Sequence, residues 1–201
     1  MNKEWSESNK IIQMQLKKEA TFTQGIQTLL GLRQSLADVL YSFKEELSRE
    51  DYNSIPFINA NGYHNKTIAY SIWHIFRIED IVAHTLIKGD EQIFFSGNYQ
   101  EYTSSPIITT GNELEKQQIA DFSRKLNIEK LYTYMADVKE STDDLLRNMS
   151  YADSKRKITD KEKEHLKTLH VVSTDEKAFW LIDYWCGKDI KGLIQMPFSR
   201  H

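Results

Sequence analysis

Glycine and proline, the residues that most often interrupt helices, are scarce in this sequence, with 8 and 3 among 201 residues respectively. Because glycine weakens a helix and proline breaks its hydrogen-bond ladder, a chain with so few of either keeps most of its length in long regular elements. No segment shows the period-two alternation of polar and apolar residues that is typical of a strand. The sequence therefore predicts an all-α protein.

Apolar residues recur at steps of three and four along three segments, which predicts long helices over 23–47, over 67–88 with Gly89 as its stop, and from Asn127 onward. The last of these repeats has the seam of antiparallel bundle packing: Ile128, Leu131, Met135, Val138, Thr142, Leu145 and Met149. Shorter helices are expected over 11–20, 112–125 and 188–194 and after the capping boxes that begin at Thr110, Thr159 and Ser173. Residues 48–65 and 90–111 read as connections.

The charge balance excludes several classes of partner. The chain has 26 Lys and Arg against 29 Asp and Glu, a net charge of −3, and the charged run over 155–167 mixes both signs. This favours neither nucleic acid nor an anionic membrane as a partner. The polar N-terminus does not read as a signal peptide, no stretch approaches 18 apolar residues, and the single cysteine, Cys186, is expected to be buried and inert. The sequence therefore predicts a cytoplasmic protein.

The local sequence holds no strong catalytic or metal signature. None of the six histidines (His64, His74, His84, His165, His170 and His201) are four residues apart, and HExxH, GxSxG and a phosphate loop are absent. A metal site would have to form from separate helices, as a bundle core allows. Glu79 falls on the apolar face of the helix over 67–88 and needs a partner, because burying an unpaired carboxylate is very costly.

The order of four segments is more informative than any one of them. These are TIAYSIWHIFRIEDIVAHTLI (67–87), the Thr110-Gly111-Asn112 turn before ADFSRKL, NIEKLYTYMADV (127–138) and FWLIDYW…MPFSRH (179–201). Together they resemble the DinB-like superfamily, the YfiT-related group of four-helix metal-binding proteins, over roughly residues 65–201. The resemblance implies a four-helix bundle with accessory short helices over 21–201, with residues 1–20 as an N-terminal extension.

The resemblance also implies a divalent metal, zinc or nickel, held by one histidine of the second helix and by a pair four residues apart that opens the last helix. His74 matches the first ligand, and His201 matches the first member of the pair. The second member would follow His201 by four residues, so the C-terminal helix is expected to be missing from this sequence. Three explanations stay open: the sequence is a piece of a longer one, a partner subunit completes the site, or the protein works without a metal.

Two functions follow. The resemblance implies a metal-dependent thiol S-transferase or hydrolase that acts on a small molecule, with a low-molecular-weight thiol as a candidate substrate and no catalytic residue assigned. Arg77, one turn from His74, is a candidate to receive an anionic substrate group, and Glu79 is a candidate to orient a ligand or act as a base. The alternative is a non-catalytic, metal-free binding or stress protein that acts as an oligomer; a homodimer is expected.

Overall fold

The computed structural model describes residues 2–55, 57, 59 and 65–195, and within these ranges the regular elements are helices, with one isolated bridge between Lys157 and Asp189. The longest helices are α2 (Glu19–Glu46) and α8 (Ile128–Arg147); α4 (Ile68–Asp80) continues as the π-helix η2 (Ile81–Lys88). Gly89 ends η2 in the left-handed conformation, at φ 72°. The prediction of an all-α protein with these three long helices is confirmed.

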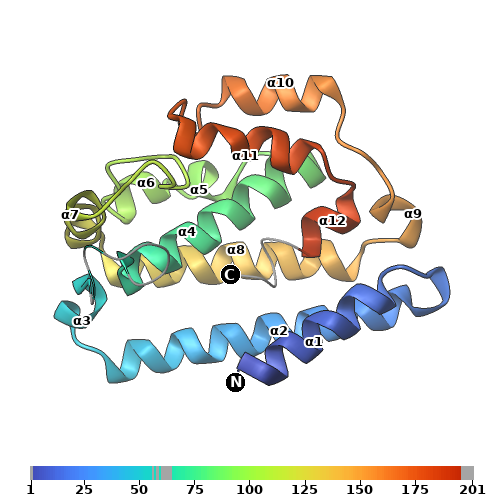
Figure 1. Ribbon diagram of the computed structural model, residues 1–201, viewed down its shortest axis with the longest axis horizontal. Helices are drawn as coiled ribbons and strands as arrows, with labels where there is room; N and C mark the ends of the chain where they lie inside the picture. Colours follow the sequence, from blue (N-terminus) through green and yellow to red (C-terminus); the bar gives the residue numbers. More distant parts are fainter. Residues whose placement is uncertain (1, 56, 58, 60–64, 196–201) are drawn as a thin grey trace.

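The remaining helices are short and surround the long ones (Figure 1). Along the chain they are α1 (Asn2–Gln15), α3 (Arg49–Asn53), α5 (Ile93–Ser96), α6 (Tyr99–Tyr102), α7 (Gln117–Lys125), α9 (Tyr151–Ser154), α10 (Asp160–Thr168), α11 (Glu176–Cys186) and α12 (Ile190–Gln195). Figure 1 shows α1 beside α2 on one side of the molecule, α4 and α8 across the middle, and α10 and α11 on the opposite side. The predicted helix over 11–20 has the wrong bounds, because α1 runs over Asn2–Gln15 and α2 begins at Glu19. Ile12 and Leu16 are buried in the apolar cluster that α1 and α2 share.

The segment formed by α4 and η2 is the centre of the core. Trp73 of α4 and Ile81, Val82 and Leu86 of η2 are fully buried, as expected for a helix that is apolar on more than one side. The α4 half packs with α8, α5 and α6 into one apolar cluster, and the η2 half packs with α1, the first half of α2 and the C-terminal helices into a second cluster. The two clusters are therefore joined through one continuous helix.

A buried ionic group links the three long helices. Glu79 finds its partner in Arg33 of α2, whose guanidinium donates two hydrogen bonds of 2.8 Å to the Glu79 carboxylate and one of 2.7 Å to Asp143 of α8. Burial alone would lower the pKa of Arg33, but the two carboxylates raise it above its ordinary value, so the guanidinium stays charged. The prediction that Glu79 needs a partner is confirmed, and the partner comes from a neighbouring helix.

The predicted helix starts are correct at two places and wrong at two. Asn127 caps α8, and Thr159 and Glu162 form the capping box of α10. At α11 the cap is Asp175 rather than Ser173. No helix begins at Thr110: its hydroxyl donates to Asn112, Glu113 accepts from Thr109, and α7 begins only at Gln117. Side-chain hydrogen bonds within the loop have replaced the predicted capping box.

The two predicted connections contain short helices. Residues 48–65 include α3, which has its own capping box between Ser48 and Asp51. Residues 90–111 include α5 and α6. The carboxylate of Asp80 accepts hydrogen bonds from the backbone N–H groups of Ile93 and Phe94, which satisfies the first donors of α5. The cap of α3 lies within a single turn, and the cap of α5 comes from a tertiary contact. Helices this short have no apolar periodicity from which they could be predicted.

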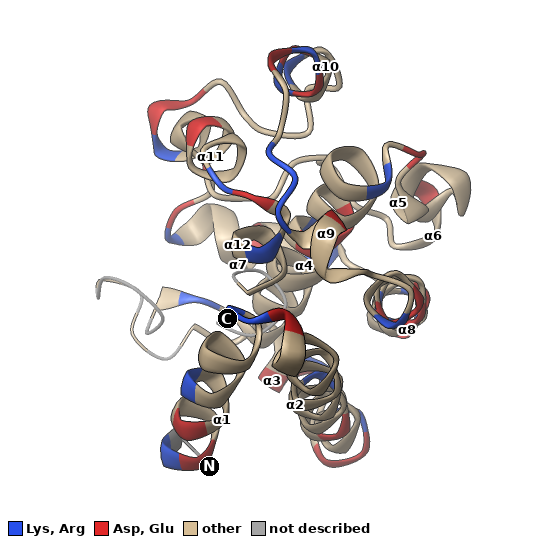
Figure 2. Ribbon diagram, turned by 90° about the vertical axis from the view of Figure 1, so that its right-hand side faces the viewer, with Lys and Arg blue, Asp and Glu red and all other residues tan. Residues whose placement is uncertain are grey.

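Residues of both charge signs are distributed over several helices (Figure 2). Lysine and arginine alternate with aspartate and glutamate on α1, α2, α8 and α10. Among the described helices, none is long and apolar enough to cross a membrane.

Candidate functional site

One face of α4 holds the loop over 108–111 through four successive carbonyl groups. In loop order, the oxygens of Ile108, Thr109, Thr110 and Gly111 accept hydrogen bonds from Arg77 Nε (3.0 Å), Trp73 Nε1 (3.2 Å), His74 Nδ1 (2.9 Å) and the Tyr70 hydroxyl (3.0 Å). The chain thereby brings together two of the segments that carry the DinB resemblance, the α4 sequence and the turn at Thr110-Gly111-Asn112. His74 lies within this contact.

The contact with the loop fixes the proton of His74. A carbonyl oxygen only accepts hydrogen bonds, so the bond from Nδ1 to Thr110 places a proton on Nδ1. A backbone carbonyl that holds Nδ1–H in this way is the usual support of a histidine that binds a metal through Nε2. The side chain is half-buried.

The ring of His74 is also held by an aromatic neighbour. Tyr70, one turn earlier on α4, stacks on it with ring centroids 5.5 Å apart and an angle of 12° between the planes. Lys66 lies over the Tyr70 ring, with its ammonium 4.9 Å from the centroid. Burial, reinforced by the charge of Glu113, raises the pKa of Tyr70 well above its ordinary value, so its hydroxyl stays protonated and donates to Gly111.

Glu113 contributes a carboxylate to the same loop. One oxygen, Oε1, accepts from the Thr109 hydroxyl, while Oε2 is buried without a hydrogen-bond partner in the described part of the molecule. Such an oxygen is costly to leave unpaired and is a ligand type that zinc accepts. Sequence reasoning placed Glu113 in a capping box and missed it; the only signal was a carboxylate close to the Thr110-Gly111-Asn112 turn.

The structure gives other roles to the remaining candidates on α4. Arg77 is fully buried and donates to the Asp80 carboxylate, the Gln92 side chain and the Ile108 carbonyl. This position makes Arg77 a structural group rather than a receptor for an anionic substrate. Glu79 is paired with Arg33 in the buried ionic group described above, so its contacts are structural as well.

His201, the second predicted ligand, lies outside the described residues, as does His64. His165 and His170 are exposed on and after α10. Cys186 is half-buried, and burial raises the pKa of its thiol to about 11, in agreement with the prediction of an unreactive side chain.

Within residues 2–55, 57, 59 and 65–195 no three His, Cys, Asp or Glu side chains are grouped so that they could hold a metal ion. His74 and Glu113 are therefore candidate donors rather than a complete site. Neither a model of a known protein family nor a curated protein matches the chain.

Proposed function

We propose that this chain is a metal-binding helical protein of DinB-like type, in which His74 binds a divalent ion, zinc or nickel, through Nε2. The observation that carries the proposal is the hydrogen bond between His74 Nδ1 and the Thr110 carbonyl, which selects the tautomer that a metal ligand needs. The contact joins two segments on which the resemblance rests.

The donors on this face fit such an ion. The imidazole nitrogen suits zinc and nickel, and the unpaired oxygen of Glu113 on the neighbouring loop is a second candidate donor. In the DinB-like arrangement His201 is a further ligand. A divalent ion held with an open position would act as a Lewis acid and generate a nucleophile at neutral pH. The proposed activity is transfer of a small thiol, or hydrolysis, on a small-molecule substrate.

The first test is the metal content of protein purified without chelators or a histidine tag. We expect close to one zinc or nickel ion per chain, and a loss of at least about tenfold in His74→Ala. His165→Ala is the matched control, because His165 is exposed and far along the chain on α10. Metal below about a tenth of an ion per chain, or equal metal in both variants, would overturn the proposal.

One observation favours the alternative, a metal-free protein that acts as an oligomer. Helix α11 exposes three large aromatic side chains, Phe179, Trp180 and Tyr184, and the last two contact each other with ring centroids 5.5 Å apart. Exposed aromatic residues grouped on one helix are typical of protein interfaces. An oligomer that forms through α11 and contains no metal would select this function over the first.

A further inference from the structure

A serine of α8, a histidine of η2 and an aspartate of the turn after η2 are joined by two successive contacts. The Ser141 hydroxyl of α8 is 3.1 Å from His84 Nε2, and His84 Nδ1 is 2.7 Å from the Asp90 carboxylate. Carboxylates only accept hydrogen bonds, so the Nδ1 proton faces Asp90, and in the tautomer that this contact selects Nε2 accepts from Ser141. These are the contacts through which a histidine activates a serine in hydrolases, where the arrangement is recognised by geometry and not by sequence order.

The backbone after η2 places the aspartate. Gly89, in the left-handed conformation, and Asp90 both donate their backbone N–H groups to the His84 carbonyl, at 2.7 and 3.1 Å. This turn brings Asp90 back against the ring of a residue six positions earlier. His84 itself is only 2% exposed, so its ring is held between η2 and α8 while the Ser141 side chain remains half-buried.

Asp90 orients two groups at once. Its Oδ1 faces His84, and its Oδ2 is 2.9 Å from the Lys88 ammonium. Burial opposes ionisation of Asp90, but the hydrogen bonds from Lys88 and His84 outweigh it and hold the pKa of the carboxyl below its ordinary value. The carboxylate is therefore charged at neutral pH and can stabilise a positive charge on the imidazole.

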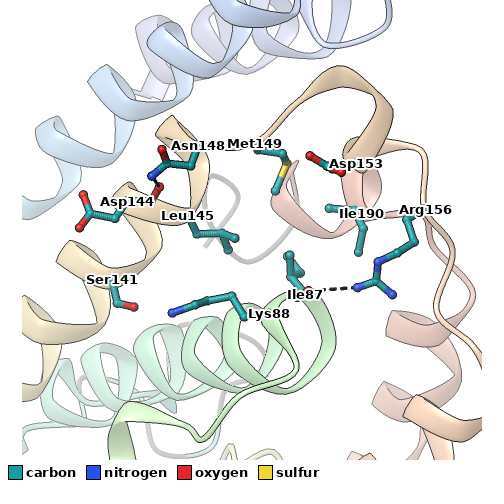
Figure 3. Close-up of a pocket in the computed structure, with 10 residues that line it drawn as sticks. All are labelled: Ile87, Lys88, Ser141, Asp144, Leu145, Asn148, Met149, Asp153, Arg156 and Ile190. Atoms are coloured by element: carbon teal, nitrogen blue, oxygen red, sulfur yellow. Dashed lines mark hydrogen bonds between the residues drawn. The ribbon is translucent and has the colours of Figure 1, made fainter.

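A pocket of about 510 Å³ opens beside these residues, and Ser141 and Lys88 are on its wall (Figure 3). Figure 3 shows the Ser141 hydroxyl and the Lys88 ammonium pointing toward each other. Leu145 of α8, Met149 after the end of α8 and Ile190 of α12 form an apolar wall. The volume suits a small molecule, and the apolar wall suits a short hydrocarbon group.

We infer that Ser141, His84 and Asp90 form a second site, a serine esterase centre for small carboxylic esters with a short apolar acyl group, independent of the metal proposed at His74. This site combines the pocket with His84 as the base, Asp90 as the carboxylate that orients it, and the neighbouring cation of Lys88. Ser141 lies inside a helix, and the sequence around it contains no motif that predicts this site.

The reaction balances with ester and water alone. Ser141 Oγ attacks the acyl carbon as its proton passes to His84 Nε2, and the Lys88 ammonium on the same pocket wall is the nearby positive charge. The bond from the acyl carbon to the alcohol oxygen then breaks, and the leaving alcohol takes the proton from His84. Water passes a proton to the same nitrogen and attacks the acyl carbon. The bond from the acyl carbon to Ser141 Oγ then breaks, Ser141 takes the proton back from His84, and the carboxylic acid leaves.

Covalent labelling with a fluorophosphonate probe tests the inference directly. Trypsin cuts after Lys139 and Arg147, so Ser141 is the only serine of the peptide over 140–147 and its labelling can be read by mass. We expect this peptide to carry the probe in the wild-type protein, with or without a chelator. Labelling and p-nitrophenyl acetate hydrolysis should fall at least about 100-fold in Ser141→Ala and His84→Gln.

The controls separate chemistry from folding. Ser35→Ala makes the same change at an exposed position on α2 and should label as the wild type does. Asp90→Asn, on an exposed turn, tests the carboxylate if His84→Gln does not fold. An unlabelled 140–147 peptide in the folded wild type, or hydrolysis that survives in Ser141→Ala, would overturn the inference. A protein without metal that labels at Ser141 would disprove the metal proposal alone.

Discussion

At the scale of single residues, Arg33 is the side chain on which the three long helices depend. It is 4% exposed and pairs with both Glu79 and Asp143, so its removal takes from the buried Glu79 the cation that neutralises it, while Asp143 keeps Lys139 at 2.7 Å. We expect Arg33→Met to lower the free energy of unfolding by about 3–5 kcal/mol, measured by urea denaturation. Gln34→Ala, at the next and exposed position of α2, should change it by less than about 0.5 kcal/mol.

The sequence could predict only half of this ionic group. The apolar neighbours of Glu79 show that its carboxylate is buried and must be paired. Its partner is 46 residues away along the chain, and the other end of the group is 110 residues from Arg33. No local pattern encodes contacts at such separations, so Arg33 and Asp143 become visible only when the helices are packed. The contact between His84 and Ser141, 57 residues apart, could not be predicted for the same reason.

At the scale of the element, the end of η2 depends on a glycine. Gly89 adopts φ 72°, a conformation that strains any residue with a Cβ atom. We expect Gly89→Ala to destabilise the protein by about 1 kcal/mol, although nothing lies close enough to contact the added methyl group. Gly31→Ala is the matched control: it adds the same methyl group in open space inside α2, where we expect stabilisation by about 0.5–1 kcal/mol. Equal effects of the two changes would contradict this explanation.

The capping box of α10 makes part of the stability depend on pH. Partial burial of Glu162 opposes its ionisation, but the hydrogen bonds from Thr159 and Arg156 lower the pKa of its carboxyl. The pKa of Glu162 in the folded protein therefore lies below the unfolded value of about 4.3. The stabilisation of the folded protein by this carboxylate is complete above the unfolded pKa and is lost as the pH falls through the folded pKa. We expect the urea midpoint of Glu162→Gln to fall less steeply than that of the wild type in this acid range. If the urea midpoints of the two proteins change with pH in parallel, the capping box does not contribute to the pH dependence of stability.

The elements themselves were largely predictable, since α2, α4 with η2, and α8 carry long apolar repeats and Gly89 stands where the helix ends. The sequence does not predict the π-helical turns of η2, the start of α7, or the short helices α3, α5 and α6. At α7 the side chains of Thr109, Thr110 and Glu113 bond within the loop rather than capping a helix. Composition alone does not decide between these two uses of the same residues.

At the scale of the whole molecule, the exposed aromatic face of α11 bears on the oligomeric state. We expect the protein to sediment as a homodimer, and Trp180→Glu to sediment as a monomer, because a charge in the centre of an apolar interface is costly to bury. The side chain of Trp180 is 51% exposed in the single chain. Tyr41→Glu, at an exposed aromatic position on α2, is the control and should leave the dimer intact. Identical sedimentation of all three proteins would show that α11 is not the interface.

One of the four hydrogen bonds between α4 and the 108–111 loop, from His74 Nδ1 to the Thr110 carbonyl, carries the proposed function, because it places the proton on Nδ1. The measurement that tests this most directly is the long-range ¹H–¹⁵N spectrum of the His74 imidazole, recorded before and after one equivalent of zinc. The account predicts that Nδ1 carries the proton throughout and that the Nε2 resonance shifts when zinc is added. A proton on Nε2, or an Nε2 resonance that zinc leaves unchanged, would contradict it.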